Sequence, residues 1–489
     1  MIRKTLRGKL AVVAAISALG LVMAGCGGDS SSGDGDSTAT SGGDTSTTDT
    51  GTTDTTDTTD TGDTGDTGEE VVVPEGATEV VFWMQHFQDA EDAWYKSQVD
   101  AFNASQSAIF VNLEVVPADA WDQKLTAAQA SGTAPDVYTR AYNQIATLAT
   151  QGLIQDMKDL IPAESWADLQ ENVLAMVTVD GGYYAYPLLV EPSMVLFYRT
   201  DLVEAAGLDP ASPPKTFDEL VEWARALKPT LPEGAFALGL AQNATEMSWT
   251  TWGIQYGLAG HLMLNGDWSE GLADDEAFAP LFELYSTLYS EGLIPKQALA
   301  GYTDAVPYGE GNLAMMINGS WASGQLINEY PDSIANTAVA KVPLATDSPD
   351  KASASLGGWT LVLDAMSDAP QESAEFINYI YGGDPQVISE YFKTTQYSKM
   401  SPRKSVAEVM AADPNVNSVN PFSATITADI VPSAIAEAQY PWDISMAFGT
   451  QLEAAMLEGK DAAACGADAQ SAIVDLIDQL GIAGTGPGE

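Results

Sequence analysis

The side chains of this sequence that are suited to chemistry are mainly carboxylates and aromatic rings. The 489 residues include 68 Asp and Glu, 18 Tyr, 13 Phe and 11 Trp, but only two histidines, His86 and His261. A zinc site built mainly from histidine is therefore not expected, and we predict neither a metal nor a cofactor. Glycosidases work with a pair of carboxyl groups. In so acidic a chain, however, the presence of candidate pairs carries little information.

The common catalytic motifs are missing from the sequence. There is no Gly-x-x-x-x-Gly-Lys-Ser/Thr loop for nucleotide phosphates, no Gly-x-Ser-x-Gly turn for a nucleophilic serine, and no Cys-x-x-Cys pair. We therefore predict that the protein is not an enzyme. A secreted carbohydrate-active enzyme, most simply a glycosidase, is the alternative.

The N-terminus has the order of a secretory signal. Four bases within the first nine residues precede an apolar run of 16 residues at 10–25, shorter than the ~20 residues that span a bilayer. The run ends in Ala24-Gly25-Cys26, which resembles the lipobox of bacterial lipoproteins, with Met23 where an aliphatic residue is usual. This resemblance implies that residues 1–25 are removed and that Cys26 carries lipid. An ordinary signal peptide with an accidental cysteine is the alternative.

The segment 26–70 is predicted to be a disordered linker. It consists almost wholly of Gly, Ser, Thr and Asp, with twelve acids and no base. Such a segment buries too little apolar surface to offset its ordering entropy, and its like charges repel one another. We therefore expect a spacer between Cys26 and a folded part.

The remaining residues, 71–489, exceed what one hydrophobic core usually supports, so two lobes are expected. The net charge of −48 becomes −40 for this part once the four bases of the signal and the twelve acids of the linker are excluded. Such a field repels nucleic acid and anionic lipid head groups. With Cys26 lipidated, Cys465 lacks a disulfide partner and is expected to be a small buried apolar residue.

Strand and helix patterns alternate through the folded part. Short apolar runs predict strands at 79–84, 109–116, 135–138, 236–240, 313–317, 338–342 and 360–363. Helices are predicted at 89–103, 118–131 and 373–381. This alternation predicts an α/β fold with a mainly parallel sheet and helices on both faces.

Several segments of the folded part follow one another in a distinctive order. They are TAPDVY at 133–138, LATQGLIQDM at 148–157, GGYYAYPLLVEPSMVLFYRTDL at 181–202, AGL at 206–208, PKTFDEL at 214–220, GEGNLAMMINGSW at 309–321, VPL at 342–344, GGW at 357–359 and SPRKS at 401–405. In order and spacing they resemble the extracellular solute-binding proteins of carbohydrate ABC importers, the group that includes maltose-binding protein. The resemblance covers nearly all of 71–489. Two departures are FYRT at 197–200, where the family usually has Tyr-Tyr-Asn-Lys, and Val137, where an aromatic residue often follows Pro-Asp.

The resemblance implies a periplasmic-binding-protein-like fold, in which two α/β lobes are joined by hinge strands and the ligand cleft lies between them. The chain would cross between the lobes near 191–194, 341–344 and 381–385. The first lobe would then comprise 71–190 with 343–381, and the second lobe 191–342 with 382–489.

The resemblance also places polar and aromatic residues at the cleft. A sugar has hydroxyl groups that amides and carboxylates can bind and apolar faces that rings can cover. The candidates are Gln85, His86 and Gln88 after the first strand, Asp122 early in the second helix, Tyr138 and Arg140 at the rim, Glu191 at the hinge, Gly357, Gly358 and Trp359 at a strand start, and Trp249, Trp321, Arg403 and Trp442 in the second lobe. A structural role for His86 and a surface position for Asp122 are alternatives. Trp321 is expected on a turn, whereas Trp223 is expected in the core.

The function that the resemblance implies is capture of a sugar or oligosaccharide outside the cytoplasmic membrane and its delivery to an ABC permease. The protein would be a monomer without a nucleic-acid partner, attached to a bacterial membrane through lipid on Cys26. A receptor for another small polar solute, such as a peptide, a polyamine or a compatible solute, is the alternative among binding proteins.

Overall fold

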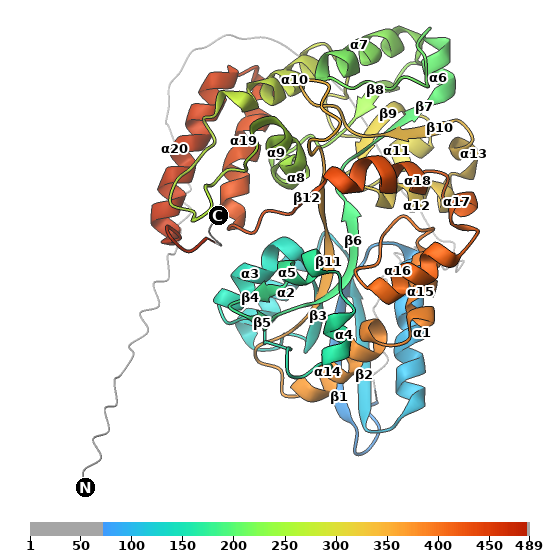
Figure 1. Ribbon diagram of the computed structural model, residues 1–489, viewed down its shortest axis with the longest axis vertical. Helices are drawn as coiled ribbons and strands as arrows, with labels where there is room; N and C mark the ends of the chain where they lie inside the picture. Colours follow the sequence, from blue (N-terminus) through green and yellow to red (C-terminus); the bar gives the residue numbers. More distant parts are fainter. Residues whose placement is uncertain (1–71, 487–489) are drawn as a thin grey trace, which may run out of the picture. The chain divides into compact units, whose positions relative to one another are not determined.

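The computed structural model describes residues 72–486, in which helices and strands alternate (Figure 1). The predictions made for the signal peptide at 1–25, for Cys26 and for the linker at 26–70 lie outside the described residues. No helix within 72–486 combines the length and the apolar character needed to cross a bilayer.

The larger sheet is mixed in strand direction. Its strands are β1 (Thr78–Gln85), β2 (Ile109–Val116), β3 (Val137–Ala141), β6 (Tyr186–Pro192), β11 (Ser355–Leu363) and β12 (Ile435–Ala436), in the order β12-β11-β3-β1-β2 with β6 paired to β11. β1 runs parallel to β2 and β3, whereas β11 runs antiparallel to both β3 and β6. β11 also runs parallel to β12, so three of the five strand pairings are parallel and the prediction of a mainly parallel sheet is met only in part. β11 returns to this sheet after a long excursion, so no local strand–helix–strand unit fixes its direction.

Helices cover both faces of this sheet. Along β1 the alternate residues Val80, Phe82 and Met84 pack into one core cluster, while Trp83 packs against the other. The first cluster includes residues of α1 (Asp89–Ser105), α4 (Ala163–Ala167), α14 (Pro370–Ile377), α15 (Pro385–Thr394) and α16 (Lys404–Ala412). The second includes residues of α2 (Trp121–Ser131), α3 (Tyr142–Thr150) and α5 (Glu171–Met176). This sheet, with these helices and the small hairpin of β4 (Thr178–Val179) and β5 (Gly182–Tyr183), is called the first lobe below.

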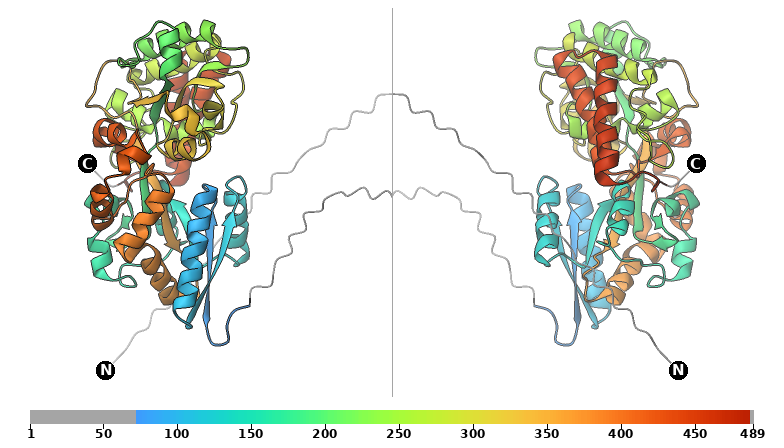
Figure 2. Two further views of the ribbon diagram at one scale, coloured as in Figure 1. Left: turned by 90° about the vertical axis from the view of Figure 1, so that its right-hand side faces the viewer. Right: turned by 90° about the vertical axis from the view of Figure 1, so that its left-hand side faces the viewer.

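A second sheet of four strands forms the centre of the second lobe. Its order is β10-β7-β9-β8, from β7 (Val195–Arg199), β8 (Phe236–Gly239), β9 (Leu313–Asn318) and β10 (Thr337–Ala340). The helices around it are α6 (Thr200–Ala205), α7 (Phe217–Leu227), α8 (Ala244–Thr250), α9 (Trp252–Ala259), α10 (Ala279–Ser290), α11 (Val306–Gly309), α12 (Trp321–Glu329), α13 (Pro331–Ile334), α18 (Ser423–Thr425), α19 (Trp442–Glu458) and α20 (Ala462–Leu480). Figure 2 shows α19 and α20, in red, side by side.

One large core cluster fills the second lobe. Trp223, together with Leu220 and Leu227 of α7, belongs to it, which confirms the core position predicted for this tryptophan. Cys465 is fully buried in the same cluster, as predicted for a small apolar residue.

The second crossing lies further along the chain than the predicted 341–344. Leu344 and Ala354 pack into the core of the second lobe, and β11 of the first lobe begins at Ser355. Residues 343–354 therefore remain with the second lobe instead of entering the first.

The third crossing also differs from the prediction at 381–385. Ile388, Tyr391 and Val406 pack into the first lobe, so α15 and α16 belong there and not to the second lobe. The chain reaches the second core only at Phe422, beyond α17 (Val416–Val419). An amphipathic pattern shows that a helix has an apolar face, but it does not show which lobe that face meets.

Candidate functional site

A cleft of about 1030 Å³ is lined by side chains from both lobes. The first lobe contributes Gln85, His86, Phe87, Gln88, Asp89, Ala90, Ala118, Ala141, Asn143, Glu191, Gly358, Trp359, Thr394, Gln396 and Lys399. The second lobe and the segment that leads into α19 contribute Ser193, Trp249, Trp252, Thr303, Asp304, Trp321, Gln325, Asn328, Glu329, Glu437 and Trp442. The lining thus combines aromatic rings with amides, hydroxyls and carboxyls.

The loop after β1 lies at the cleft, as the sequence predicted for Gln85, His86 and Gln88. β1 holds the start of the loop, because the Gln85 backbone N–H donates to Thr139 Oγ1 at 3.1 Å and that of His86 to the Val116 carbonyl at 2.8 Å. His86 Nδ1 lies 2.7 Å from Asp92 Oδ2 in α1, so its ring is fixed by a carboxylate while it lines the cleft.

Rings of the second lobe form a connected aromatic group. Trp249 of α8 and Trp321 have ring centroids 6.2 Å apart at an interplanar angle of 36°, and Tyr302 packs edge-on against Trp249. Trp321 Nε1 donates to the Thr303 carbonyl at 3.2 Å. A side chain at Gly319 would overlap the Trp321 ring, so the glycine allows the ring to fold back over the backbone.

Trp321 is the first residue of α12 and not a turn residue, which corrects the prediction in its local detail. Trp442 is the first residue of α19 and is 38% exposed. Both rings thus project from the beginning of a helix, and both line the cleft.

A further pair of rings comes from the first lobe. Trp359 of β11 packs against Phe87 with ring centroids 4.9 Å apart. The preceding residue, Gly358, has a φ of +135°, and a Cβ there would lie 2.7 Å from the Leu189 carbonyl oxygen. The glycine is therefore required both by its backbone conformation and by the close approach of β6.

Two carboxyl groups face the cleft with raised pKa values. Burial raises the pKa of Glu191 to about 7, although Lys399 lowers it in part. Burial also raises the pKa of Glu437 to about 8, with Glu191 adding to the shift and the Asn143 backbone N–H opposing it. A carboxyl group close to its pKa at neutral pH can serve either as a hydrogen-bond donor or as an acceptor.

A buried ion pair lies beside these carboxyls. Lys399 Nζ is 2.7 Å from Glu91 Oε1, and the two side chains are 3% and 0% exposed. Glu91 also accepts from the Tyr391 hydroxyl at 2.6 Å, while the Lys399 ammonium lies 5.2 Å from the Phe87 ring centroid. Lys399 therefore lines the cleft with its charge already matched by Glu91.

Three predicted site residues, Tyr138, Arg140 and Asp122, do not line the cleft, and Asp122 takes the surface position that was its alternative. Tyr138 is fully buried, and its hydroxyl bonds Asp364 and Gln129. Arg140 is 6% exposed and lies 3.2 Å from Asp122, whose side chain is 81% exposed. Side chains alternate along β3, so Tyr138 and Arg140 lie on the face that α2 and α3 cover, opposite to Val137.

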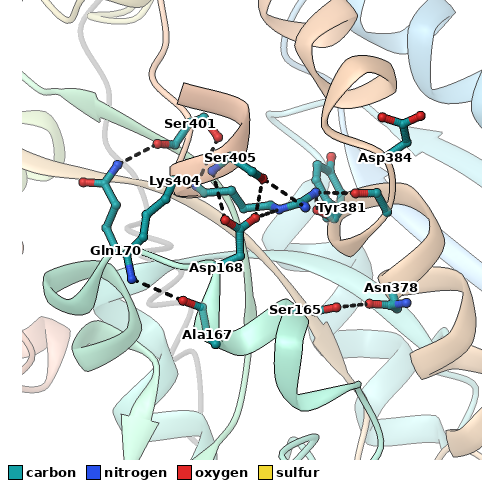
Figure 3. A network of polar contacts seen from close by, with 12 residues as sticks. Ser165, Ala167, Asp168, Gln170, Asn378, Tyr381, Asp384, Ser401, Lys404 and Ser405 are labelled. Carbon is teal, nitrogen blue, oxygen red and sulfur yellow. Dashed lines mark hydrogen bonds and ion pairs between the residues drawn. The ribbon is translucent and has the colours of Figure 1, made fainter. Parts of the chain in front are cut away.

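Arg403 is likewise a structural residue. Its Nε donates to Asp168 Oδ2 at 2.7 Å, and its Nη1 donates to the Tyr381 and Gly383 carbonyls. Figure 3 shows Asp168 bonded to Ser405 in the same network. Arg403 therefore ties α4 and α16 of the first lobe together and is not part of the second lobe's edge.

Several cleft residues were missed by sequence reasoning. Asn143, Ser193, Gln325, Asn328, Gln396, Lys399 and Glu437 belong to this group. Glu437 is the clearest example, because no local sequence pattern distinguishes this glutamate from the other acids, which number 68 in all. The one related signal is the adjacent glycine pair, since a side chain at Gly357 would overlap the Glu437 carboxyl group.

Among the described residues, His86, Asp89 and Asp92 offer ligand atoms within 4.8 Å of one another, an arrangement that could hold a metal ion. The two aspartates lie in the first turn of α1, where carboxylates are favoured by the helix dipole, and His86 already bonds Asp92. The group is therefore accounted for without a metal.

Two α/β lobes that share a cleft lined by rings and hydrogen-bonding groups define a two-lobed ligand-binding protein. The chain belongs to the bacterial extracellular solute-binding protein family, which it matches over residues 87–387. The expected periplasmic-binding-protein-like fold is confirmed by solved structures. The chain is similar to an ABC transporter solute-binding protein of Thermotoga lettingae bound with alpha-D-tagatose (TM-score 0.70, 21% identity, 82% of this chain and 100% of the other). It is also similar to maltose-bound MalE3 of T. maritima (TM-score 0.69, 20% identity, 82% and 100%).

Relatives found by sequence match this chain over only part of their length. The chain is 26% identical to a binding protein of Brucella abortus (strain 2308) over 52% of this chain, and 25% identical to the maltodextrin-binding protein MdxE of Bacillus subtilis over 56% of it. Each match spans 61% of the relative, so the chain covers about three-fifths of these proteins. A maltooligosaccharide ABC transporter solute-binding lipoprotein of Streptococcus pneumoniae (strain R6) is 25% identical over 65% of this chain and 73% of the relative.

Proposed function

We propose that this chain is the solute-binding subunit of an ABC importer for a sugar or oligosaccharide. The observation that carries the proposal is the cleft, where Trp249 and Trp321 of one lobe lie across from Trp359, Gln85 and Glu191 of the other. Rings suit the apolar C–H faces of a sugar, and the amides and carboxyls suit its hydroxyl groups. The Bacillus and Streptococcus relatives are named for maltodextrin and maltooligosaccharide, and these names support the same class of ligand.

Capture would proceed by closure of the lobes. A ligand that contacts residues of both lobes binds the closed arrangement better than the open one, and it shifts the population accordingly. The closed complex would then be the form that the permease receives. The protein would act as a monomer, since one chain supplies both sides of the cleft.

The ligand test is calorimetry and thermal shift on the purified domain with a panel of neutral mono- and oligosaccharides. A sugar that binds only the folded state raises the melting temperature. We expect such a sugar to be recovered unchanged by chromatography after incubation. Hydrolysis of the bound sugar would favour the glycosidase instead, and the absence of any sugar binding would contradict the proposal.

Attachment to the outer side of the membrane would depend on Cys26. The lipobox-like sequence before this residue supports a lipid anchor, and stable attachment needs two or more acyl chains. We predict that Cys26→Ser moves the protein from the membrane fraction to the soluble fraction, as followed by immunoblotting. Membrane fractionation equal to that of the parent, after normal processing of the signal, would exclude the anchor.

A further inference from the structure

Glu191 and Glu437 reach the cleft floor at adjacent positions. In the antiparallel pair of β6 and β11, Glu191 lies directly opposite Gly357. Residues that face each other in this way share one side of the sheet, with Cβ positions about 4.5–5.5 Å apart. The Glu437 carboxyl group occupies the place where a Gly357 side chain would stand. The two carboxyl groups are therefore neighbours on the cleft side of the sheet.

Neither carboxyl group has a cation to itself. Glu191 is 7% exposed, and its Oε2 is buried without a hydrogen-bond partner in the described part of the chain. Glu437 is held by neutral backbone groups: the Asn143 N–H donates to its Oε2 at 3.3 Å, and a backbone hydrogen bond from Gly358 also opposes the rise in its pKa that burial causes. Lys399 is the one lysine or arginine among the described lining residues, and Glu91 already holds it.

The other titratable groups around the cleft add negative charge. Asp89 at the start of α1 lines the first lobe's side, where His86 is engaged with Asp92. Asp304 and Glu329 line the side of the second lobe. The floor thus holds two acids that lack a counter-charge, inside a cleft whose walls supply further acids.

A ligand group can relieve this arrangement in two ways. A hydroxyl donates one hydrogen bond but brings no charge, so it leaves the negative charge of an ionised carboxyl unmatched. An ammonium group brings a positive charge and three donors, and it can bond both carboxylates at once. Of the two groups, only the ammonium supplies the positive charge that Glu191 and Glu437 lack.

We propose that the ligand carries a protonated amine, which binds between Glu191 and Glu437, so that the substrates of this importer are amino sugars. This inference rests on the proposed sugar-binding function. Amino sugars and neutral sugars should differ in the number of protons released or taken up when they bind. Raised pKa values leave the pair partly protonated near pH 7, so an ammonium group should expel protons and a neutral sugar should retain or take them up.

Calorimetry with matched sugars tests the proposal. The probes are glucosamine with glucose and the β-1,4-linked glucosamine disaccharide with cellobiose, each titrated at pH 7 in two buffers of different ionisation enthalpy. We expect the amino sugar of a pair to bind at least tenfold more tightly than its hydroxyl counterpart and to release protons. Calcium chloride and sodium chloride, titrated alone, test whether a metal ion takes the same place.

Variants test whether Glu191 and Glu437 cause the preference for the amino sugar and the proton release. Glu437→Gln should reduce the preference for the amino sugar to within about twofold and abolish proton release. Glu408→Gln removes the same charge from an exposed position in α16 and should leave both properties as in the parent. If Glu437→Gln does not fold by circular dichroism, proton release by the parent still decides the question.

The outcomes separate this proposal from the proposed function. Binding of neutral sugars as tight as that of their amino counterparts would overturn the amine while leaving sugar capture intact. Binding of a metal ion alone at this pair would overturn it as well. Failure of neutral and amino sugars alike would overturn sugar capture itself, and the present inference with it.

Discussion

Trp321 owes its place at the cleft to short-range features of its own segment. Gly319 leaves room for the ring, and the indole N–H is satisfied by the Thr303 carbonyl, so the ring is held without help from the opposite lobe. Trp249 packs beside it. Such a pre-organised aromatic surface loses little side-chain entropy when a ligand covers it, which lowers one of the costs of binding.

We predict that Trp321→Ala weakens binding of the identified sugar by about tenfold or more. Loss of a ring that covers ligand should cost about 1–3 kcal/mol, and ~1.4 kcal/mol corresponds to a factor of ten. Calorimetry measures the effect. Tyr256→Ala, which removes a 42% exposed ring of α9 outside the cleft lining, serves as the control and should bind as the parent does. An unchanged affinity in Trp321→Ala would exclude this ring from the site.

Glu191 should also make the ligand-free protein sensitive to pH. Its pKa is about 7 in the folded state, against about 4.3 in an unfolded chain. Between these values the folded state binds more protons than the unfolded state. The stability associated with the protonated group is therefore fully present below about pH 4.3 and is lost as the pH rises through about 7.

We predict that Glu191→Gln, which stays uncharged, makes the free energy of unfolding decline less steeply between about pH 5 and 8 than in the parent. Urea unfolding of the ligand-free protein at each pH gives this slope. The exposed Glu408→Gln again serves as the control, since it removes the same charge without removing a buried group. Parallel curves for the parent and for Glu191→Gln would show that the buried carboxyl does not titrate as described.

Among the elements, β11 does the most to assemble the site. It pairs with β3 and β6, it carries Trp359, and its two glycines admit Glu437 on one side and the Leu189 carbonyl on the other. The pairing register with β6 shifts between Trp359 and Thr360. The strand thus determines the positions of the Glu191 and Glu437 carboxyl groups and of the Trp359 ring.

We predict that Gly358→Ala destabilises the protein by about 1–3 kcal/mol. A φ of +135° is strained for any residue with a Cβ, and that Cβ would lie 2.7 Å from the Leu189 carbonyl oxygen. Denaturant unfolding measures the change. Gly301→Ala is the matched control, because its Cβ would meet nothing closer than Glu246 Oε1 at 3.8 Å, so it should lie within about 0.5 kcal/mol of the parent. Equal stability of the two variants would argue against strain at Gly358.

Local elements of the first lobe were predictable because their patterns are local. The strand over 109–116 and the end of the helix at Ser131, capped by Gly132, agree with the structure. The direction of β11 and the lobe that receives α15 were not predictable. Both depend on contacts between distant segments, such as Tyr391 with Trp94.

Within the site, the sequence indicated residues that stand beside glycine or proline turns or follow a recognisable strand. Gln85, Glu191 and Trp321 are of this kind, and they line the cleft. The prediction of a ligand-binding role for Arg403 is wrong because its charge is matched by Asp168, a partner 235 positions away. Glu437 was missed for the complementary reason, since only the fold brings it beside Glu191.

At the scale of the whole molecule, the acids outnumber the bases so strongly that pairing cannot offset them. The residues 71–489 carry a net charge of −40. Some of the few cations are already engaged inside the first lobe, where Lys399 pairs with Glu91 and Arg403 with Asp168. Most of the remaining acids therefore repel one another across the surface, and folding brings them closer together than they are in an extended chain.

We predict that the melting temperature of the 71–489 domain rises when the salt concentration is raised from about 0.01 M to about 0.15 M. The screening length falls from ~30 Å to ~8 Å over this range, so repulsion between surface acids is reduced more than the attraction inside the buried ion pairs. Differential scanning calorimetry in sodium chloride, repeated in potassium chloride, measures the shift and separates screening from specific ion binding. Because screening does not distinguish the two salts, both should raise the melting temperature equally. A flat or falling response in both would mean that short-range ion pairs, and not the net charge, dominate the electrostatics of this protein.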